Sequence, residues 1–244
     1  MTLKLYPALP ADAGRISDIH MAAFGSNAML LAQFHTPDVR EGLRESIRRK
    51  ALADIDDPKI TVLVVRNLPS DPDVANAGDG GFHRSLVNGL PGEPGSEGTP
   101  EGEVVAFAKW SHPVAKGEEY EETAWIWPPG TNLDILEGWG RVTEEVQEQA
   151  VGDRPCYPLG LTFMGTDPAH KRKGAASMMV RWGLDQCEKD GVQGYLESTL
   201  DAAPFYEKMG FAAFKNISLR YQVEGYDKYE IYEEIAFLYS NSSI

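Results

Sequence analysis

Seven consecutive residues could bind an anion at the start of a helix. They read Lys171-Arg172-Lys173-Gly174-Ala175-Ala176-Ser177, and the apolar spacing after them predicts a helix. Three cations at a helix start oppose the helix dipole, at a cost of about 0.3 to 1 kcal/mol for each exposed charge. A bound anion would remove this repulsion, and the small residues would let it reach the backbone N–H groups of the first turn. A solvated basic turn, or a short imitation of a nuclear-localisation signal, is the alternative interpretation.

The basic segment belongs to a longer stretch from Leu159 to Ser177, and two further stretches follow it, from Tyr195 to Thr199 and from Ala203 to Phe211. In order and spacing they resemble the acetyl-CoA site of the GNAT superfamily of N-acetyltransferases. The phosphate loop of that family reads Gln or Arg, two residues, Gly, one residue, and Gly or Ala. This chain matches the loop from Lys171 to Ala176, with Lys in the first position. The N-terminal half agrees with the family only in its strand-helix-helix-strand layout.

The resemblance implies which residues bind acetyl-CoA, the acyl donor. The pyrophosphate would lie on the backbone N–H groups from Arg172 through Ser177, with the side chains of Lys171 and Lys173 as additional charges. Backbone groups at Met164 and Thr166 would hold the pantetheine arm, and the Met164 N–H would stabilise the oxyanion formed when an amine attacks the thioester. The implied cofactor-binding residues are Met164, Thr166, Lys171, Arg172, Lys173, Gly174, Ala175, Ala176, Ser177, Thr199 and Phe205. No metal is expected.

Tyr206 occupies the tyrosine position of the family, just before Glu-Lys-x-Gly-Phe. The resemblance makes it the general acid for the departing thiolate, so that Tyr206 and the backbone of Met164 are the expected catalytic groups. A phenol has a pKa of about 10 and a thiol a pKa of about 8.5, so the phenol can protonate the thiolate only under one of two conditions. Either the site lowers the pKa of the phenol, or the transition state develops strong basicity. Half-buried packing beside Phe205 is the structural alternative.

The general base stays unassigned at this stage. Some family members carry a glutamate four residues before the thioester-facing position, where this chain has Gly160, and their usual Asn ahead of the tyrosine is Thr199 here. His112, Glu197 and Glu119 are candidates, and water could also take the proton from an amine. The missing glutamate supports a second hypothesis, a non-catalytic acyl-CoA-binding module. A third is an enzyme that binds a nucleotide phosphate on the same basic loop.

The elements that must position these residues alternate between strand and helix. We expect strands at Leu3–Leu9, Ile60–Val65, Val104–Trp110, Tyr157–Met164, Gly194–Ser198 and Phe211–Tyr221. We expect helices around Ile16–Ala23, from Pro37 through Ala51, around Leu136–Val146, at Gly174–Lys189 with a stop at Gly191, and at Ala202–Met209. This order predicts an α/β (α+β) fold in a single domain over residues 1–244. The resemblance implies a GNAT-like mixed, mostly antiparallel central sheet flanked by helices.

A long segment at about residues 67–103 is rich in Gly, Pro and acidic residues. Loops of this length inside a compact domain are unusual, and the composition favours a disordered insertion. Since strands are expected on both sides of it, the insertion should join two neighbouring strands of one sheet.

The composition limits the partners. The chain has 244 residues, of which 37 are acidic and 23 basic, and its formal net charge of −14 disfavours nucleic acids and anionic membrane surfaces. The two cysteines, Cys156 and Cys187, provide neither a disulfide scaffold nor metal-ligand spacing. Without a leader-like start or a long apolar run, the chain is expected to be a soluble, cytoplasmic protein.

An acidic run at Glu118–Glu122 and four tryptophans (Trp110, Trp125, Trp127 and Trp139) would suit a cationic or aromatic acceptor, through charge attraction and cation–π contact. The resemblance implies acetyl transfer from acetyl-CoA by direct transfer in a ternary complex, and the acidic run and the tryptophans favour a primary amine of a small molecule as the acceptor. A protein lysine, a protein N-terminus and an alcohol are the other acceptors considered. A homodimer is compatible with the sequence.

Overall fold

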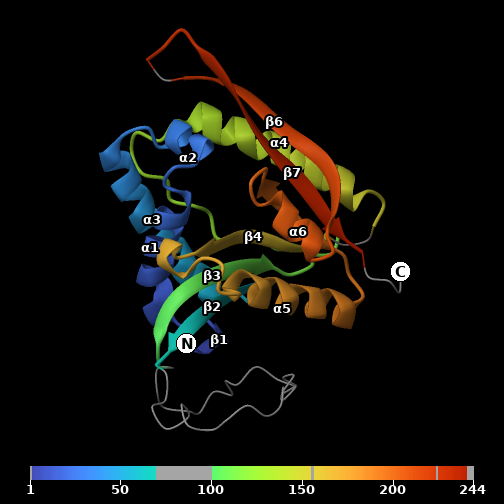
Figure 1. The fold of residues 1–244 in the computed structure, drawn as a ribbon. Coiled ribbons are helices and arrows are strands. Elements are labelled where there is room, and N and C mark those ends of the chain that lie inside the picture. The colour runs from blue at the N-terminus through green and yellow to red at the C-terminus, as the bar shows by residue number, and fades with distance from the viewer. Residues whose placement is uncertain (1, 70–100, 155–156, 224, 241–244) are drawn as a thin grey trace, which may run out of the picture.

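The computed structural model describes residues 2–69, 101–154, 157–223 and 225–240. Its strands form one sheet in the order β1-β2-β3-β4-β5-β7-β6, and β4 and β5 are its parallel pair (Figure 1). This result confirms the predicted mixed, mostly antiparallel sheet. The strands are β1 (Thr2–Pro7), β2 (Ile60–Leu68), β3 (Glu103–Ser111), β4 (Leu159–Thr166), β5 (Gly194–Thr199), β6 (Ala212–Gln222) and β7 (Tyr229–Tyr239).

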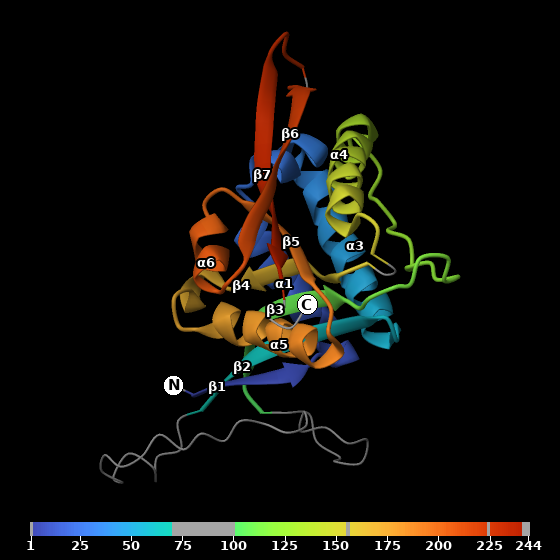
Figure 2. The same ribbon diagram turned by 90° about the vertical axis from the view of Figure 1, so that its right-hand side faces the viewer.

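Helices cover both faces of this sheet. They are α1 (Ala13–Phe24), α2 (Ala28–Gln33), α3 (Pro37–Asp56), α4 (Leu133–Val151), α5 (Ala175–Asp190) and α6 (Ala203–Lys208), with short 3₁₀ turns η1 (Pro10–Asp12) and η3 (Pro168–His170). Alternate residues of one strand enter different cores, since Leu63 packs with α5 and α6 whereas Val64 packs with α1 and α3. Helix α4 covers β6 and β7 on the same side as α1 and α3 (Figure 2).

The expected elements are present, with two additions. The apolar stripe Val39, Leu43, Ile47 and Ala51 is buried along α3, and α5 ends at Gly191 in a left-handed conformation with φ +66°. Neither α2 nor β7 is predicted from the sequence. Strand β7 inserts between β5 and β6, and Figure 1 shows the β6–β7 hairpin extending beyond the rest of the sheet alongside α4.

Trp110 belongs to the core beneath α5, so the prediction that it shapes the acceptor site is wrong. Its side chain is completely buried. A Cβ atom at Gly183 of α5 would lie 2.2 Å from the indole ring, and therefore glycine is what lets α5 approach β3 this closely. An aromatic ring in this position is part of the packing between helix and sheet.

Strands β2 and β3 are antiparallel neighbours, with Ile60 opposite Ser111 and Asn67 opposite Glu103. The segment between them therefore joins adjacent strands, as expected, while residues 70–100 lie outside the described residues, as does Cys156. Within the described ranges, no helix combines the length and the apolar character that a membrane span requires. The same ranges contain no group of three or more His, Cys, Asp or Glu side chains arranged to hold a metal ion.

Candidate active site

The sheet divides where β4 and β5 stop pairing. Their parallel ladder ends at Leu161 and Leu196, after which β4 continues along β3 to Thr166 and β5 continues along β7 to Thr199. The register of β3 and β4 shifts at Thr162, which is an extra residue of β4 between the pairs Trp110–Leu161 and Lys109–Phe163. Such a bulge bends its strand and leads β4 away from β5. We call the resulting opening the fork.

Backbone N–H groups of β4 point into the fork. The N–H of Asp167 donates to the carbonyl of Val105 in β3 at 2.9 Å, and successive N–H groups of a strand point to opposite edges. The regular register from Met164 to Thr166 therefore directs the N–H groups of these two residues away from β3. Both are hydrogen-bond donors at the edge where β5 no longer pairs.

The loop before α5 is shaped to receive an anion. Arg172 and Gly174 have φ values of +61° and +94°, and backbone turns of this kind gather N–H groups into an anion-binding concavity. The N-cap Gly174 provides no side-chain acceptor, so the N–H groups of Ala175, Ala176 and Ser177 begin the helix without intrahelical partners. A Cβ atom at Gly174 would meet nothing within 4 Å, which leaves room for a ligand beside the backbone.

The basic side chains surround this concavity, and Asp167 fixes its base. Lys171, Arg172 and Lys173 are exposed, and the Lys173 ammonium donates to the carbonyl of Ala169 at 3.0 Å. The carboxylate of Asp167 accepts the Ala169 N–H at 2.8 Å and pairs with Arg15 of α1. A phosphate bound to the backbone would therefore meet cations on an anchored loop.

Tyr206 lies on α6 with its ring buried against Phe205, Phe211 and Phe237. Its side chain is 7% exposed, and its hydroxyl makes no hydrogen bond with any residue that the structure describes. Burial, together with the nearby charge of Glu234, raises the pKa of Tyr206 above the ordinary value of a phenol. The site therefore does not lower the pKa of this phenol. Proton donation to the thiolate then depends on the other condition, the strong basicity that develops on sulfur in the transition state.

Thr199 and Phe205 lie on the β5 side of the fork. Thr199 ends β5 opposite Glu234 of β7, and its carbonyl accepts the N–H of Ala202 at 3.1 Å, which leads the chain into α6. Phe205 packs half-buried against Tyr206 with ring centroids 5.1 Å apart. The fork thus brings the β4 residues, the α5 loop and the Tyr206 region to one end of the β4–β5 ladder.

Two carboxylates that face the α4 side complete this region, and only Glu197 of the two is a candidate on sequence grounds. Glu234 accepts a hydrogen bond from the Tyr232 hydroxyl at 2.6 Å, and Glu197 accepts one from the Tyr195 hydroxyl at 2.9 Å. Burial is the largest cause that raises the pKa of both, and the charge of Glu197 helps to bring the pKa of Glu234 to about 7. Glu234 was missed because β7 lies beyond the motif. The alternation Glu230, Tyr232, Glu234, Ala236 was the available signal.

The other candidate bases lie elsewhere. His112 follows the pair Ser111–Gly160, four residues along β3 from Ala108, the partner of Met164, or about 13 Å at the usual rise of a strand. Its ring bonds to Thr61 at 2.8 Å, and burial lowers its pKa. Glu119 is an exposed residue of the loop before α4.

Much of the acidic run has partners within the protein. Glu118 pairs with Lys59 at 2.5 Å, and Glu122 pairs with both Lys50 and Lys109 at 2.5 Å. These contacts attach the loop before α4 to α3 and β3. The expected attraction of this run for a cationic acceptor is reduced accordingly, because its buried end is already neutralised.

The other predicted acceptor-site tryptophans lie on the face opposite α5 and α6. Trp125 and Trp127 stack with centroids 4.7 Å apart, and Trp125 meets Phe163 of β4 edge-on at 6.0 Å. Trp139 of α4 contacts the Tyr232 ring at 5.1 Å. Aromatic side chains therefore flank the fork from both the α3 side and the α4 side.

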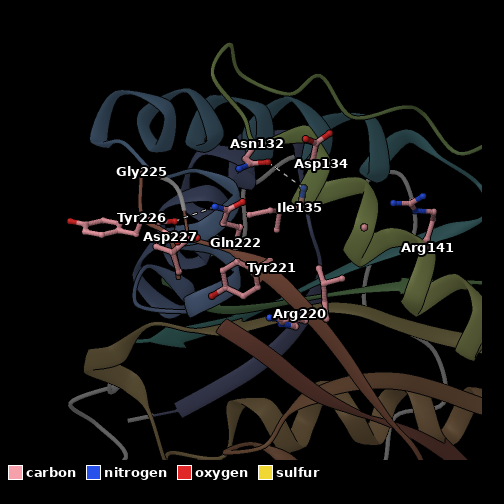
Figure 3. A pocket seen from close by; sticks show the side chains of 13 residues that line it. Asn132, Asp134, Ile135, Arg141, Arg220, Tyr221, Gln222, Gly225, Tyr226 and Asp227 are labelled. Carbon is pink, nitrogen blue, oxygen red and sulfur yellow. Dashed lines mark hydrogen bonds between the residues drawn. The ribbon is translucent and has the colours of Figure 1, made fainter. Parts of the chain in front are cut away.

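A cavity of about 660 Å³ opens between α4 and the outer part of the β6–β7 hairpin. Ile135 of α4 and Tyr221 of β6 are among its lining residues (Figure 3). Gly138 of α4 and Leu219 of β6 also line it. It lies on the side of the sheet that carries Glu234, since Leu219 is opposite Tyr232. The cavity is large enough for a small organic molecule.

The raised pKa of Glu234 predicts a pH dependence of stability. A carboxyl with a folded-state pKa of about 7 and an ordinary value of 4.5 contributes stability that is fully present below pH 4.5 and is lost as the pH rises to about 7. We expect the unfolding free energy to fall by on the order of 2 kcal/mol more in the wild type than in Glu234→Gln between pH 5 and pH 8. Urea unfolding of both proteins measures this difference, and parallel pH curves would contradict it.

Comparisons with known proteins agree with this architecture. The family model of the acetyltransferase (GNAT) family matches residues 138–211. A probable acyltransferase, SID5 of Ajellomyces capsulatus, is 46% identical over 43 residues, which make up 18% of this chain and 32% of that protein. The matched part thus spans about a third of the length of this curated relative.

Solved structures share the fold at low sequence identity. A histone acetyltransferase HPA2 and related acetyltransferase from Corynebacterium glutamicum aligns with a TM-score of 0.55 and 17% identity over 99% of this chain and 98% of its own. A mosquito arylalkylamine N-acetyltransferase like 5b aligns with a TM-score of 0.56 and 12% identity, over 97% of this chain and 99% of its own. The C-terminal condensation domain of Ebony, in complex with beta-alanyl-dopamine, aligns with a TM-score of 0.58 and 11% identity, over 98% of both chains.

Proposed function

Because the chain carries a GNAT acetyltransferase segment within the fold of that superfamily, we propose that it transfers an acetyl group from acetyl-CoA directly to a primary amine of a small molecule in a ternary complex. The observation that carries this proposal is the loop before α5, where N–H groups and cations converge next to the fork. The open space at Gly174 and the small residues after it fit a pyrophosphate. Acetyl-CoA supplies an activated thioester, whose carbonyl carbon is open to an amine.

The residues around the fork divide the chemical work. The N–H groups of Met164 and Thr166 bind the arm of the donor, and the Met164 N–H stabilises the negative charge that develops on the thioester oxygen. Tyr206, from the α6 side, provides a hydroxyl for the departing sulfur. The acceptor approaches from the opposite face, where the aromatic side chains and Glu234 lie.

A small cationic acceptor suits the charge of the protein. With a net charge of −14, the chain attracts ammonium groups from a distance. The 660 Å³ cavity beside α4 has the dimensions of a small-molecule site. These two features favour a free amine over a protein N-terminus or lysine as the acceptor.

The first test is ligand-dependent thermal unfolding. Acetyl-CoA and CoA at 100 times their dissociation constants should each add about 2.7 kcal/mol of stability and raise the midpoint, whereas ATP should not. Thiol release with a panel of primary amines then measures transfer. No shift with acetyl-CoA or CoA would contradict the proposed cofactor. A shift without thiol release for any amine or alcohol would favour a non-catalytic acyl-CoA-binding module.

A further inference from the structure

We propose that Glu234, supported by Glu197, is the general base of this enzyme and binds the acceptor as an ammonium ion on the α4 side of the fork. This inference rests on the proposed function and adds to it the residue that removes the proton from the acceptor. Glu234 lies outside the segment 138–211 matched by the family model. It also lies on a different strand from Gly160, which occupies the position of the family's glutamate.

The register of β5 and β7 places the two carboxylates together. Thr199 is opposite Glu234 and Glu197 is opposite Ala236, so both glutamates project from one face of the sheet as diagonal neighbours. Tyr195 and Ala236 of that face pack against α4, whereas Leu196 and Phe237 pack against α5 and α6. The carboxylates thus face the acceptor side, just beyond the point where β4 leaves β5.

Hydrogen bonds orient each carboxylate through one oxygen. The Asn27 amide donates to the Tyr232 hydroxyl at 2.8 Å, and this hydroxyl donates to Oε1 of Glu234. Tyr195 donates to Oε1 of Glu197. Across the residues that the structure describes, the Oε2 atom of each glutamate has no donor and no ion-pair partner. Two acceptor oxygens are therefore held in place and still free to bind an N–H donor.

Tyr206 provides an independent indication that a ligand belongs here. Its ring is more than nine-tenths buried, and its hydroxyl has no partner among the described residues. The charge of Glu234 acts on this hydroxyl across the sheet. The hydroxyl is not among the buried side-chain atoms that lack a partner, so it reaches an accessible surface at the end of a buried ring. A ligand can meet it there, and the reacting atoms would lie between the Tyr206 hydroxyl and Glu234.

The electrostatics around Glu234 favour a cation. The groups that interact with it are Glu197 and Tyr195 from β5, Tyr232 from its own strand and Tyr206 from α6. Tyr221 of β6 and the indole of Trp139 of α4 lie next to Tyr232. Burial and the charge of Glu197 bring the pKa of Glu234 to about 7. At this value the carboxylate is available at neutral pH and basic enough to accept a proton, and an ammonium ion would relieve the repulsion between the two glutamates.

The proton and bond changes balance as follows. Oε2 of Glu234 takes one proton from the R–NH₃⁺ acceptor and later releases it to water. The nitrogen lone pair of R–NH₂ forms a bond to the acetyl carbon, and the electrons of the carbon–sulfur bond leave with sulfur. The nitrogen gives up its second proton to water as the amide forms, and the thiolate gains one from the Tyr206 hydroxyl. The resulting phenolate takes a proton back from water, so that one proton is released overall. The products are R–NH–acetyl and CoA–SH.

The cavity beside α4 lies close to this point along β6. Leu219 lines the cavity, and the next residue of β6 on the same face is the buried Ile217, directly opposite Glu234. Two residues of a strand span about 6.6 Å. A small amine bound in the cavity therefore lies about two residues of β6 away from the position opposite Glu234.

The test combines Glu234→Gln with Glu233→Gln, a matched control because Glu233 is exposed on the other face of β7. The probe is the most active amine of a panel of 2-phenylethylamine, tryptamine and spermidine, followed by thiol release from pH 5.5 to 9. Glu234→Gln should lower kcat/KM at least about tenfold. It should also remove the break that the wild type shows near pH 7 in the pH profile of kcat/KM, with acetyl-CoA affinity within about twofold of the wild type. Glu233→Gln should match the wild type.

Two further variants keep the proposal testable if Glu234→Gln folds poorly. The charge of Glu197 raises the pKa of Glu234, whereas the hydrogen bond from Tyr232 lowers it. Glu197→Gln should therefore move the break to lower pH, and Tyr232→Phe should move it to higher pH.

The outcomes separate this inference from the proposed function. If the wild type transfers the acetyl group and Glu234→Gln does so equally well, the role of Glu234 is overturned and the proposed function stands. The same holds if the breaks in the pH profiles of Glu197→Gln and Tyr232→Phe do not move in opposite directions. Absence of wild-type transfer to every amine in the panel would overturn the proposed acceptor class and the base together.

Discussion

Gly174→Glu is expected to weaken acetyl-CoA binding more than about 100-fold. A carboxylate at this position would occupy the space beside the N–H groups of Ala175 and Ala176, which is open in the present structure. Two negative charges about 4 Å apart repel by about 4 kcal/mol at the effective dielectric of a protein surface. The new carboxylate would also be favoured at the helix start, because it replaces the missing N-cap acceptor. The variant should therefore fold while its phosphate site is blocked.

Controls for Gly174→Glu separate charge, bulk and backbone strain. The φ of +94° at Gly174 disfavours any L-residue, and Gly174→Gln carries the same strain and bulk without the charge. Gly191→Glu places the same side chain at another left-handed position, at the opposite end of α5 and with open space around it. Calorimetric titration with acetyl-CoA should rank the affinities as Gly191→Glu, Gly174→Gln and Gly174→Glu, from tightest to weakest. Binding by Gly174→Glu at wild-type affinity would show that this loop is not the phosphate site.

The sequence predicted the parts of the fold that local patterns encode. The stripe of α3 and the β-branched run of β2 are periodic, and Gly191 ends α5 as a left-handed cap. The six-residue α2 follows an Asn27 cap, and one and a half turns contain too few residues for a periodic pattern to be recognised.

Long-range pairing was the part of the fold that local patterns could not provide. Strand β7 has a clear alternation of polar and apolar residues, yet nothing local shows that it inserts between β5 and β6. The same limit applies to the site. The phosphate loop is a continuous stretch of sequence, so its residues could be named. The bulge at Thr162 and the pairing of Glu234 with Thr199 depend on register between strands. Glu197 was considered on sequence grounds, but its partnership with Glu234 required the sheet.

Tyr206→Phe is expected to lower kcat about 10- to 100-fold, which corresponds to the loss of a hydrogen bond to a developing charge. The hydroxyl makes no hydrogen bond with the described part of the protein, so its removal leaves no protein group unpaired, and the ring keeps its contacts with Phe205, Phe211 and Phe237. Stability and acetyl-CoA affinity should therefore stay close to those of the wild type.

The pH profile and a second tyrosine decide what the Tyr206 hydroxyl does. Because burial and Glu234 raise the pKa of Tyr206, the phenol stays protonated up to pH 9, and wild-type turnover should not decline on the alkaline side through its ionisation. Tyr239→Phe removes a hydroxyl that donates to Glu188 on the surface of α5 and should leave kcat unchanged. If Tyr206→Phe also turned over at the wild-type rate, the thiolate would leave without a proton from the protein. That route is chemically feasible because the thiolate of CoA is a weaker base than a phenolate and can leave without a proton. Tyr206 would then be a packing residue of the core.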